Sequence, residues 1–139
     1  MEATTKISIG GIYSFKKSFS LVEVQRFAEL SRDHNPLHTD VAYAKDGPFG
    51  ANIVHGMLAA SLFSAILGTK YPGEGTIYLK QDLKFLRPVF IDEEVTAMVA
   101  VTAIAENVGD LLITLTTTLT KQNGKEAITG EAQVLLRRK

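Results

Sequence analysis

Two side chains suited to acid–base chemistry lie five positions apart in the stretch SRDHNPLHTD, residues 31–40. The carboxyl group of Asp33 and the imidazole of His38 can each accept or donate a proton during a reaction. A turn needs only one Asp or Asn and a Gly, yet this stretch between two apolar segments holds two carboxylates and two imidazoles. Asp33 and His38 are therefore candidates for moving protons to and from a bound molecule.

The chain before Asp33 predicts a helix that ends close to it. Residues 20–23, SLVE, have the pattern of a capping box, in which a serine caps the helix and a glutamate three positions later returns the contact. Apolar residues at helical spacing follow, so we expect a helix over residues 21–31. Asp33 would then lie just beyond the end of this helix.

The chain after Asp33 predicts a second, short helix. Asn35 can cap it and Pro36 is tolerated at its first position, so we expect residues 36 to about 45 to be helical, with His38 in the first turn. A sharp turn between the two helices would bring the carboxyl and imidazole groups together. In a plainer interpretation, Asp33 and Asn35 only cap helices and His38 is a surface residue. The residues alone leave both interpretations open.

The rest of the chain predicts one apolar helix and an antiparallel sheet. The segment HGMLAASLFSAILGTK, residues 55–70, has no charge before its last residue, which predicts a helix that is buried on every side. Alternating apolar residues and β-branched runs predict strands at residues 11–19, 77–85, 93–105, 111–121 and 126–137. The last four, in meander order with hairpin turns such as QNGK, predict an α+β architecture in which the sheet wraps the helix.

Composition limits the class of protein. The chain has 139 residues, which fits one domain over residues 1–139. Its 15 basic and 15 acidic residues cancel, so bulk charge does not favour nucleic acid or an anionic membrane as a partner. Cysteine is absent, which excludes disulfides and thiolate chemistry. The apolar run over residues 57–69 is shorter than the roughly 20 residues of a membrane span, so we expect a soluble, cytoplasmic protein.

Three stretches of the chain resemble a known family. They are FAELSRDHNPLHTD at 27–40, FGANIVHGMLAASLFS at 49–64 and YLKQDLKFLRPVFIDEEV at 78–95. They are similar to the (R)-specific enoyl-CoA hydratases of the MaoC-like, hot-dog-fold family, and the resemblance covers nearly the whole chain. It implies a long antiparallel sheet wrapped around a central helix. It also implies reversible addition of water to trans-2-enoyl-CoA, an acyl-CoA partner, no cofactor and a homodimer.

The resemblance also implies roles for particular residues. Asp33 and His38 would hold the catalytic water between them. Gly56 begins the apolar helix, where unpaired N–H groups and the positive end of the helix dipole would stabilise negative charge on the thioester oxygen. Asn35 is counted with the substrate-binding residues. Candidate residues of the acyl-chain pocket are Ser64, Leu67 and Val134. The roles of His55, Ser61 and Gln81 stay open.

Other functions remain to be weighed against hydration. A metal site from Asp33, His34, His38 and Asp40 is disfavoured because Pro36 intervenes and no His-Glu-x-x-His motif is present, so we expect no metal. A serine hydrolase is disfavoured because the chain has no Gly-x-Ser-x-Gly motif. Three alternatives stay open: a thioesterase of the same fold, a 3-hydroxyacyl-ACP dehydratase of fatty-acid synthesis, and a non-catalytic acyl-CoA binder.

The strand expected at residues 93–105 predicts a partner chain. One of its faces carries Val95, Ala97, Val99 and Val101, and the other carries Met98 and Ala100. A sheet that wraps a single helix needs only one apolar face. This pattern therefore predicts a homodimer, in agreement with the resemblance.

Overall fold

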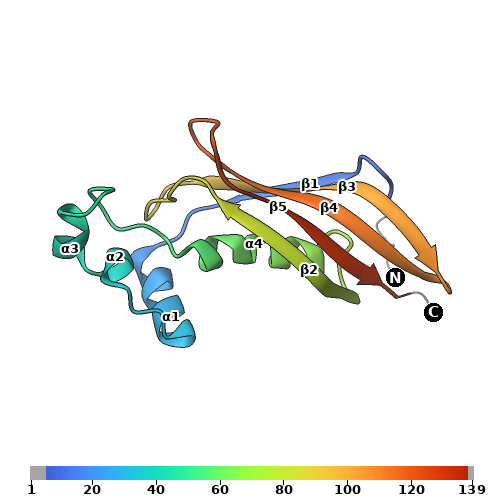
Figure 1. Cartoon of the computed structure of the whole chain (residues 1–139), viewed down its shortest axis with the longest axis horizontal. Coiled ribbons are helices and arrows are strands. Elements are labelled where there is room, and N and C mark those ends of the chain that lie inside the picture. Colours follow the sequence, from blue (N-terminus) through green and yellow to red (C-terminus); the bar gives the residue numbers. More distant parts are fainter. Residues whose placement is uncertain (1–5, 138–139) are drawn as a thin grey trace.

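A five-stranded sheet and one long helix form most of the protein in the computed structural model, which describes residues 6–137. The strands are β1 (Ile12–Lys17), β2 (Thr76–Phe85), β3 (Val95–Asn107), β4 (Asp110–Lys121) and β5 (Glu126–Leu136). The helices are α1 (Leu21–Ser31), α2 (Pro36–Thr39), α3 (Val41–Lys45) and α4 (Gly56–Thr69). Figure 1 shows α4 lying along one face of the sheet, with α1, α2 and α3 gathered beyond one end of it. The predicted α+β architecture is confirmed.

The order of strands differs from the predicted meander at one position. The order is β1-β3-β4-β5-β2, and every neighbouring pair is antiparallel. β3, β4 and β5 follow one another as expected, but β2 pairs with β5 instead of β3. The connection from β2 to β3 must therefore pass the ends of β5 and β4. One edge of β2 is left without a partner strand within the described chain.

The helix α4 packs against the sheet on one side only. Its residues Phe63, Ile66 and Leu67 are almost completely buried in the same core cluster as strand residues such as Val99 and Leu115. The prediction that this helix is buried on every side is wrong. An exposed stripe runs along it, consisting of Met57, Ser61, Ser64, Ala65 and Gly68. The sheet of a single chain covers only one side of the helix, so an apolar sequence alone does not bury the other side.

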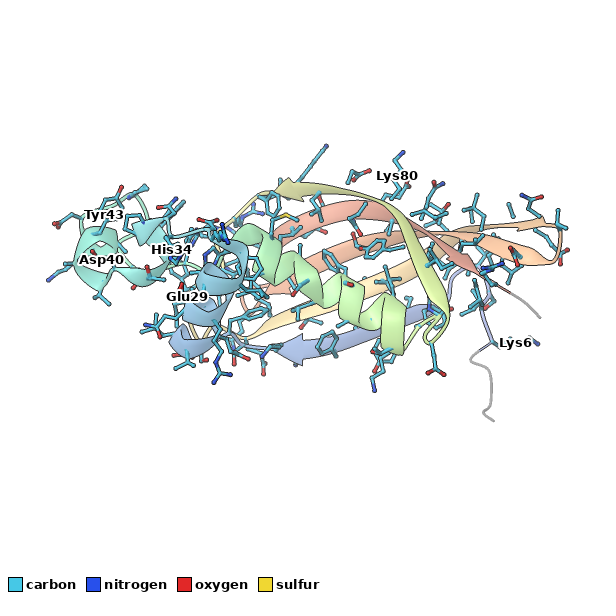
Figure 2. All side chains as sticks on the ribbon, turned by 90° about the horizontal axis from the view of Figure 1, so that it is seen from below. Lys6, Glu29, His34, Asp40, Tyr43 and Lys80 are labelled. Atoms are coloured by element: carbon cyan, nitrogen blue, oxygen red, sulfur yellow. The ribbon has the colours of Figure 1, made fainter. Side chains whose placement is uncertain are left out.

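The helices before α4 follow their local sequence signals closely. α1 begins with the predicted capping box: the Glu23 backbone N–H donates to the Ser20 hydroxyl at 3.2 Å, and the Ser20 N–H donates to the Glu23 carboxylate at 3.0 Å. The single helix expected from residue 36 to 45 is wrong, because Asp40 divides it into α2 and α3. The Asp40 carboxylate caps α3 by accepting from the Tyr43 N–H at 3.0 Å. Figure 2 shows Asp40 and Tyr43 at the projecting end of the molecule.

The length and composition of the helices determine whether any of them could cross a membrane. Among residues 6–137, no helix is both long and apolar enough to cross a membrane.

Candidate active site

A tight turn after α1 holds Asp33. Arg32 ends the helix in the left-handed conformation, with φ of 68°, and so redirects the chain. The Asp33 backbone N–H then donates to the Ser31 hydroxyl at 3.1 Å, and the Asp33 carboxylate accepts from the Asn35 N–H at 3.2 Å. These two short-range contacts keep the exposed carboxylate in a defined position beside α2.

His38 is held by a backbone carbonyl that also sets which ring nitrogen is free. Asn35 caps α2 by accepting from the Leu37 N–H at 3.0 Å, and Asn52 donates to the Leu37 carbonyl at 3.1 Å. The Nδ1 atom of His38 lies 2.8 Å from the Ile53 carbonyl oxygen. Since a carbonyl can only accept, Nδ1 must carry the hydrogen, and in the neutral ring Nε2 is then the acceptor. His38 is therefore arranged as a base.

His55 packs directly against His38. The two rings are stacked with centroids 3.9 Å apart, and the edge of Phe27 approaches His55 with a centroid distance of 4.8 Å. The Nε2 atom of His55 lies 3.1 Å from the Asp33 carbonyl oxygen and therefore donates to it. His55 thus contacts both residues of the predicted pair.

The predicted pair and the start of α4 meet at one cavity. Asp33, His38 and Gly56 all line a cavity of about 470 Å³, with apolar walls that include Phe85 and Val89. Asp33, His38 and His55 each offer one carboxylate oxygen or ring nitrogen, and these atoms lie within 4.8 Å of one another. The structure therefore brings together three residues that the sequence separates by up to 22 positions.

Gly56 gives this cavity the N-terminal end of a long helix. Its N-cap residue, His55, makes no side-chain hydrogen bond to the first turn. A Cβ atom at Gly56 would come within 2.7 Å of a ring carbon of Phe85, so glycine also allows this aromatic wall to pack closely. The first-turn N–H groups and the positive end of the helix dipole suit an anionic oxygen.

A second cavity lies further along α4. It has a volume of about 460 Å³, and its walls include Met57, Ser64, Tyr78 and Gln81. Met57 also lines the first cavity, so the two cavities share a wall. Of the predicted acyl-pocket residues, Ser64 lines this cavity. Leu67 and Val134 are buried in the core and line neither of the two.

Polar residues of the second cavity have local partners. The Ser61 hydroxyl donates to the Leu58 carbonyl at 2.6 Å, as expected for a serine within an apolar helix. The Gln81 amide donates to the buried Thr117 hydroxyl at 2.9 Å, and Gln81 accepts from the Tyr78 hydroxyl. Burial raises the pKa of Tyr78 to about 12, so this hydroxyl stays protonated at neutral pH. Gln81 therefore forms part of the polar lining.

The arrangement suits proton transfer better than metal binding. A metal ion lies in the plane of each imidazole that binds it. The rings of His38 and His55 are only 27° from parallel and stacked 3.9 Å apart, so one ion cannot lie in both planes at bonding distance. The other residues weighed for a metal site lie elsewhere. His34 is an exposed residue paired with Glu29 at 3.4 Å, both visible in Figure 2, and Asp40 caps α3.

Comparisons with known proteins agree with this geometry. A family model described as the MaoC-like domain matches residues 9–135. The chain belongs to this family. A relative from Aeromonas caviae, named (R)-specific enoyl-CoA hydratase, is 50% identical over 94% of this chain and 96% of its own length. A protein of the same name from Rhodospirillum rubrum is 43% identical over 94% of this chain and 88% of its own length.

A solved structure of a similar protein has the same fold. It is described as the (R)-hydratase from A. caviae involved in PHA biosynthesis. It superposes with a TM-score of 0.88 at 50% identity, covering 92% of this chain and 96% of the other. This similarity confirms the predicted hot-dog fold.

Several residues around the site were not found from the sequence. Asn52 anchors α2, the Ile53 carbonyl orients His38, and Met57 separates the two cavities. The position of Met57 in the first turn of the apolar helix, next to Gly56, was a signal that could have identified it. The carbonyl of Ile53 has no sequence signal, because every residue possesses one.

His55 should give the stability of the fold a pH dependence of known sign. Burial lowers the pKa of His55 below its ordinary 6.5; the hydrogen bond to the Asp33 carbonyl opposes this shift, and the nearby His38 adds to it. The unfolded chain then binds a proton at this ring at a higher pH than the folded chain does. Stability contributed by neutral His55 should therefore fall as pH decreases below 6.5 toward the lowered pKa. Urea unfolding at pH 7.5 and 5.5 should show a larger loss for the wild type than for His55→Phe.

Proposed function

We propose that this protein catalyses the reversible, (R)-specific hydration of trans-2-enoyl-CoA to (R)-3-hydroxyacyl-CoA. The observation that carries the proposal is the meeting of a carboxylate and an imidazole, whose Nδ1–H is held by a backbone carbonyl, at one cavity beside the N-terminus of a long helix. Membership of the MaoC-like family and the identity with two proteins named as hydratases support it.

In the proposed mechanism, Asp33 and His38 hold one water molecule between them. A water molecule that makes two hydrogen bonds of about 2.8 Å joins groups up to roughly 5.6 Å apart. One carboxylate oxygen of Asp33 and one ring nitrogen of His38 lie within 4.8 Å of each other, which is compatible with such a bridge. His38 Nε2 and the Asp33 carboxylate would both accept from this water and direct its oxygen toward the substrate.

The protons balance without a cofactor. Hydration adds the water oxygen, with one hydrogen, to C3 and adds a second proton to C2. The proton that leaves water passes to the Asp33/His38 pair, and the pair returns one proton to C2, so both side chains recover their starting states. Negative charge on the thioester oxygen is stabilised by the N-terminus of α4 at Gly56. Delivery of both parts of water from one pair gives syn addition.

The acyl chain would extend from the first cavity into the second. Met57 lines both cavities, and the second is bordered by Ser64, which supports its assignment to the acyl-chain pocket. Leu67 and Val134 are buried in the core, so they would contact the acyl chain only after the side chains that cover them move. Asn35 would act on the substrate site indirectly, since its side chain caps α2.

A spectrophotometric assay with crotonyl-CoA tests the proposed reaction. We expect the absorbance of the conjugated enoyl thioester to fall reversibly, little free thiol to appear with a thiol reagent, and chiral analysis to identify (R)-3-hydroxybutyryl-CoA. The same assay with the crotonyl group on acyl carrier protein compares the two carriers. Hydration leaves the thioester intact and therefore reaches an equilibrium. Hydrolysis would cleave the thioester and would not reach this equilibrium.

Two other results would contradict hydration. Rapid release of thiol without reversible loss of the enoyl absorbance would identify a thioesterase. Tight binding of acyl-CoA with neither signal would identify a non-catalytic binding protein.

We also propose that the protein is a homodimer that pairs through β2 and α4. The unpaired edge of β2 exposes Ile77 and Leu79, and the adjacent start of α4 exposes 60% of Met57. Apolar side chains beside an open strand edge favour pairing with another chain. The second face of β3, on which the sequence prediction relied, is only partly exposed at Met98 and Ala100. The proposed contact surface therefore lies at β2 instead.

Sedimentation equilibrium at micromolar concentration should give twice the chain mass of 15.1 kDa. Leu79→Lys places a charge on the proposed contact and should shift the protein to the monomer. Val108→Lys is a matched control, since Val108 is 97% exposed in the β3–β4 turn, and it should leave the mass unchanged. A wild type that sediments as a fully active monomer would disprove this assembly.

A further inference from the structure

His55 is a buried polar residue that the proposed mechanism does not use. It is 2% exposed, and its Nδ1 atom is buried without a hydrogen-bond partner among the described residues. Burying an unsatisfied polar nitrogen costs free energy, and an apolar side chain would fill the same space without that cost. A histidine at this position therefore calls for an explanation beyond packing.

Within the described residues, the hydrogen bond made by the His55 ring reaches the backbone of Asp33. Its Nε2–H donates to the Asp33 carbonyl at 3.1 Å, which joins the start of α4 to the turn after α1. The Asp33 carboxylate is in turn held by the Asn35 N–H at 3.2 Å. Because the carbonyl and the carboxylate belong to the same residue, fixing the backbone also limits the positions open to the carboxylate.

The face of His55 meets His38, the other member of the pair. Their centroids are 3.9 Å apart, while the His38 ring edge is fixed by the Ile53 carbonyl at 2.8 Å. The stacking on His55 and the hydrogen bond to the Ile53 carbonyl together restrain the orientation of the His38 ring. Burial lowers the pKa of His55, so its ring is neutral beside His38. A neutral ring does not repel the imidazolium that forms when His38 accepts a proton.

We propose that His55 is a positioning residue that sets the separation of the Asp33 carboxylate from His38 Nε2, through its hydrogen bond to one residue and its stacking on the other. The inference rests on the proposed hydratase function. His55 borders the first cavity but is only 2% exposed, so it would act mainly through Asp33 and His38, and its loss should affect kcat far more than KM. A displacement of about 1 Å in a catalytic group can cost roughly 10²-fold in rate, and this sets the expected scale.

Two substitutions separate the two contacts. His55→Phe keeps an aromatic ring to stack on His38 but removes the donor to Asp33. His55→Gln places an amide N–H near the position of Nε2 but removes the ring. We expect His55→Phe to lower kcat by roughly 10²-fold with KM nearly unchanged, and His55→Gln to recover part of that loss, about tenfold. A folded His55→Phe variant with the wild-type kcat would overturn the proposal.

A spectroscopic measurement tests the same inference without activity. The chain has three histidines, so ¹⁵N NMR of the imidazoles can be assigned with the help of His34→Ala. At neutral pH we expect the Nε2–H tautomer at His55 and the Nδ1–H tautomer at His38, with the latter kept in His55→Phe, which retains both the stacked ring and the contact with the Ile53 carbonyl. The opposite tautomer at His55 would overturn the inference. Failure of wild type to hydrate crotonyl-CoA would instead refute the proposed function, since the tautomers do not depend on turnover.

Discussion

Asp33→Asn and His38→Gln should each lower kcat for crotonyl-CoA hydration by roughly 10²–10⁴-fold, the usual contribution of a general acid or base. Both replacements keep the approximate shape of the side chain but cannot accept a proton. Asp33 is exposed, and its turn is also held by backbone contacts, so we expect its variant to fold normally. Initial rates should be measured together with circular dichroism and thermal melting.

Two comparisons sharpen this test. His34→Ala should retain the wild-type rate, because His34 is exposed and pairs with Glu29 away from the cavity lining. The double variant Asp33→Asn/His38→Gln should be about as slow as the slower single variant, since residues that act on one water do not contribute additively. A well-folded single variant near the wild-type rate would show that the pair does not perform the chemistry.

Glu93→Gln should lower the free energy of unfolding by about 3 kcal/mol, the low end of the range for breaking a buried ion pair. The Lys121 ammonium donates to the Glu93 carboxylate at 2.8 Å and also to the Pro88 carbonyl. The two side chains are only 7% and 17% exposed, so Gln at position 93 would leave a buried cation without its counter-charge. Urea unfolding monitored by circular dichroism measures the loss.

This ion pair also supports a wall of the first cavity. Pro88 and Val89 line that cavity within the connection between β2 and β3, and Lys121 ties the connection to the end of β4. The double variant Glu93→Leu/Lys121→Met removes both charges and should cost much less than Glu93→Gln alone. Lys17→Met, which breaks the exposed Lys17–Glu23 pair at 2.9 Å, should cost below about 1 kcal/mol. If Glu93→Gln and Glu93→Leu/Lys121→Met lowered the free energy of unfolding equally, Glu93 would not be neutralising a buried charge on Lys121.

Short-range sequence signals predicted the helices that carry the candidate site. The capping box at Ser20 and Glu23 placed α1 at residues 21–31, and Asn35 with Pro36 placed the start of α2 correctly. These predictions succeed because caps and proline act through hydrogen bonds and backbone angles within about four residues. Asp40 is a cap of the same kind, and its role at the start of α3 was open to the same reasoning although it was missed.

Strand order was decided by contacts between distant segments. Alternation in residues 77–85 indicates a strand, but a period of two says nothing about which strand lies beside it. β2 pairs with β5 because the chain leaves α4 at one edge of the sheet, and it must then pass β5 and β4 to reach β3. The exposed stripe on α4 was likewise decided by contacts between distant segments. Apolar composition permits burial, but only the number of covering elements determines how much of the helix is covered.

The candidate site also has some features that the sequence predicts and others that only the tertiary structure decides. Asp33 and His38 were identifiable as a pair from side-chain type and from the turn that the sequence places between them. The tautomer of His38 depends on the Ile53 carbonyl, 15 residues away, and the mutual positions of the pair depend on His55, which contacts the Asp33 carbonyl 22 residues away. Every residue has a backbone carbonyl, so the sequence does not indicate which carbonyl will form a given contact. The identity of the acid–base groups is therefore local information, whereas their orientation arises only when α1, α2 and α4 pack together.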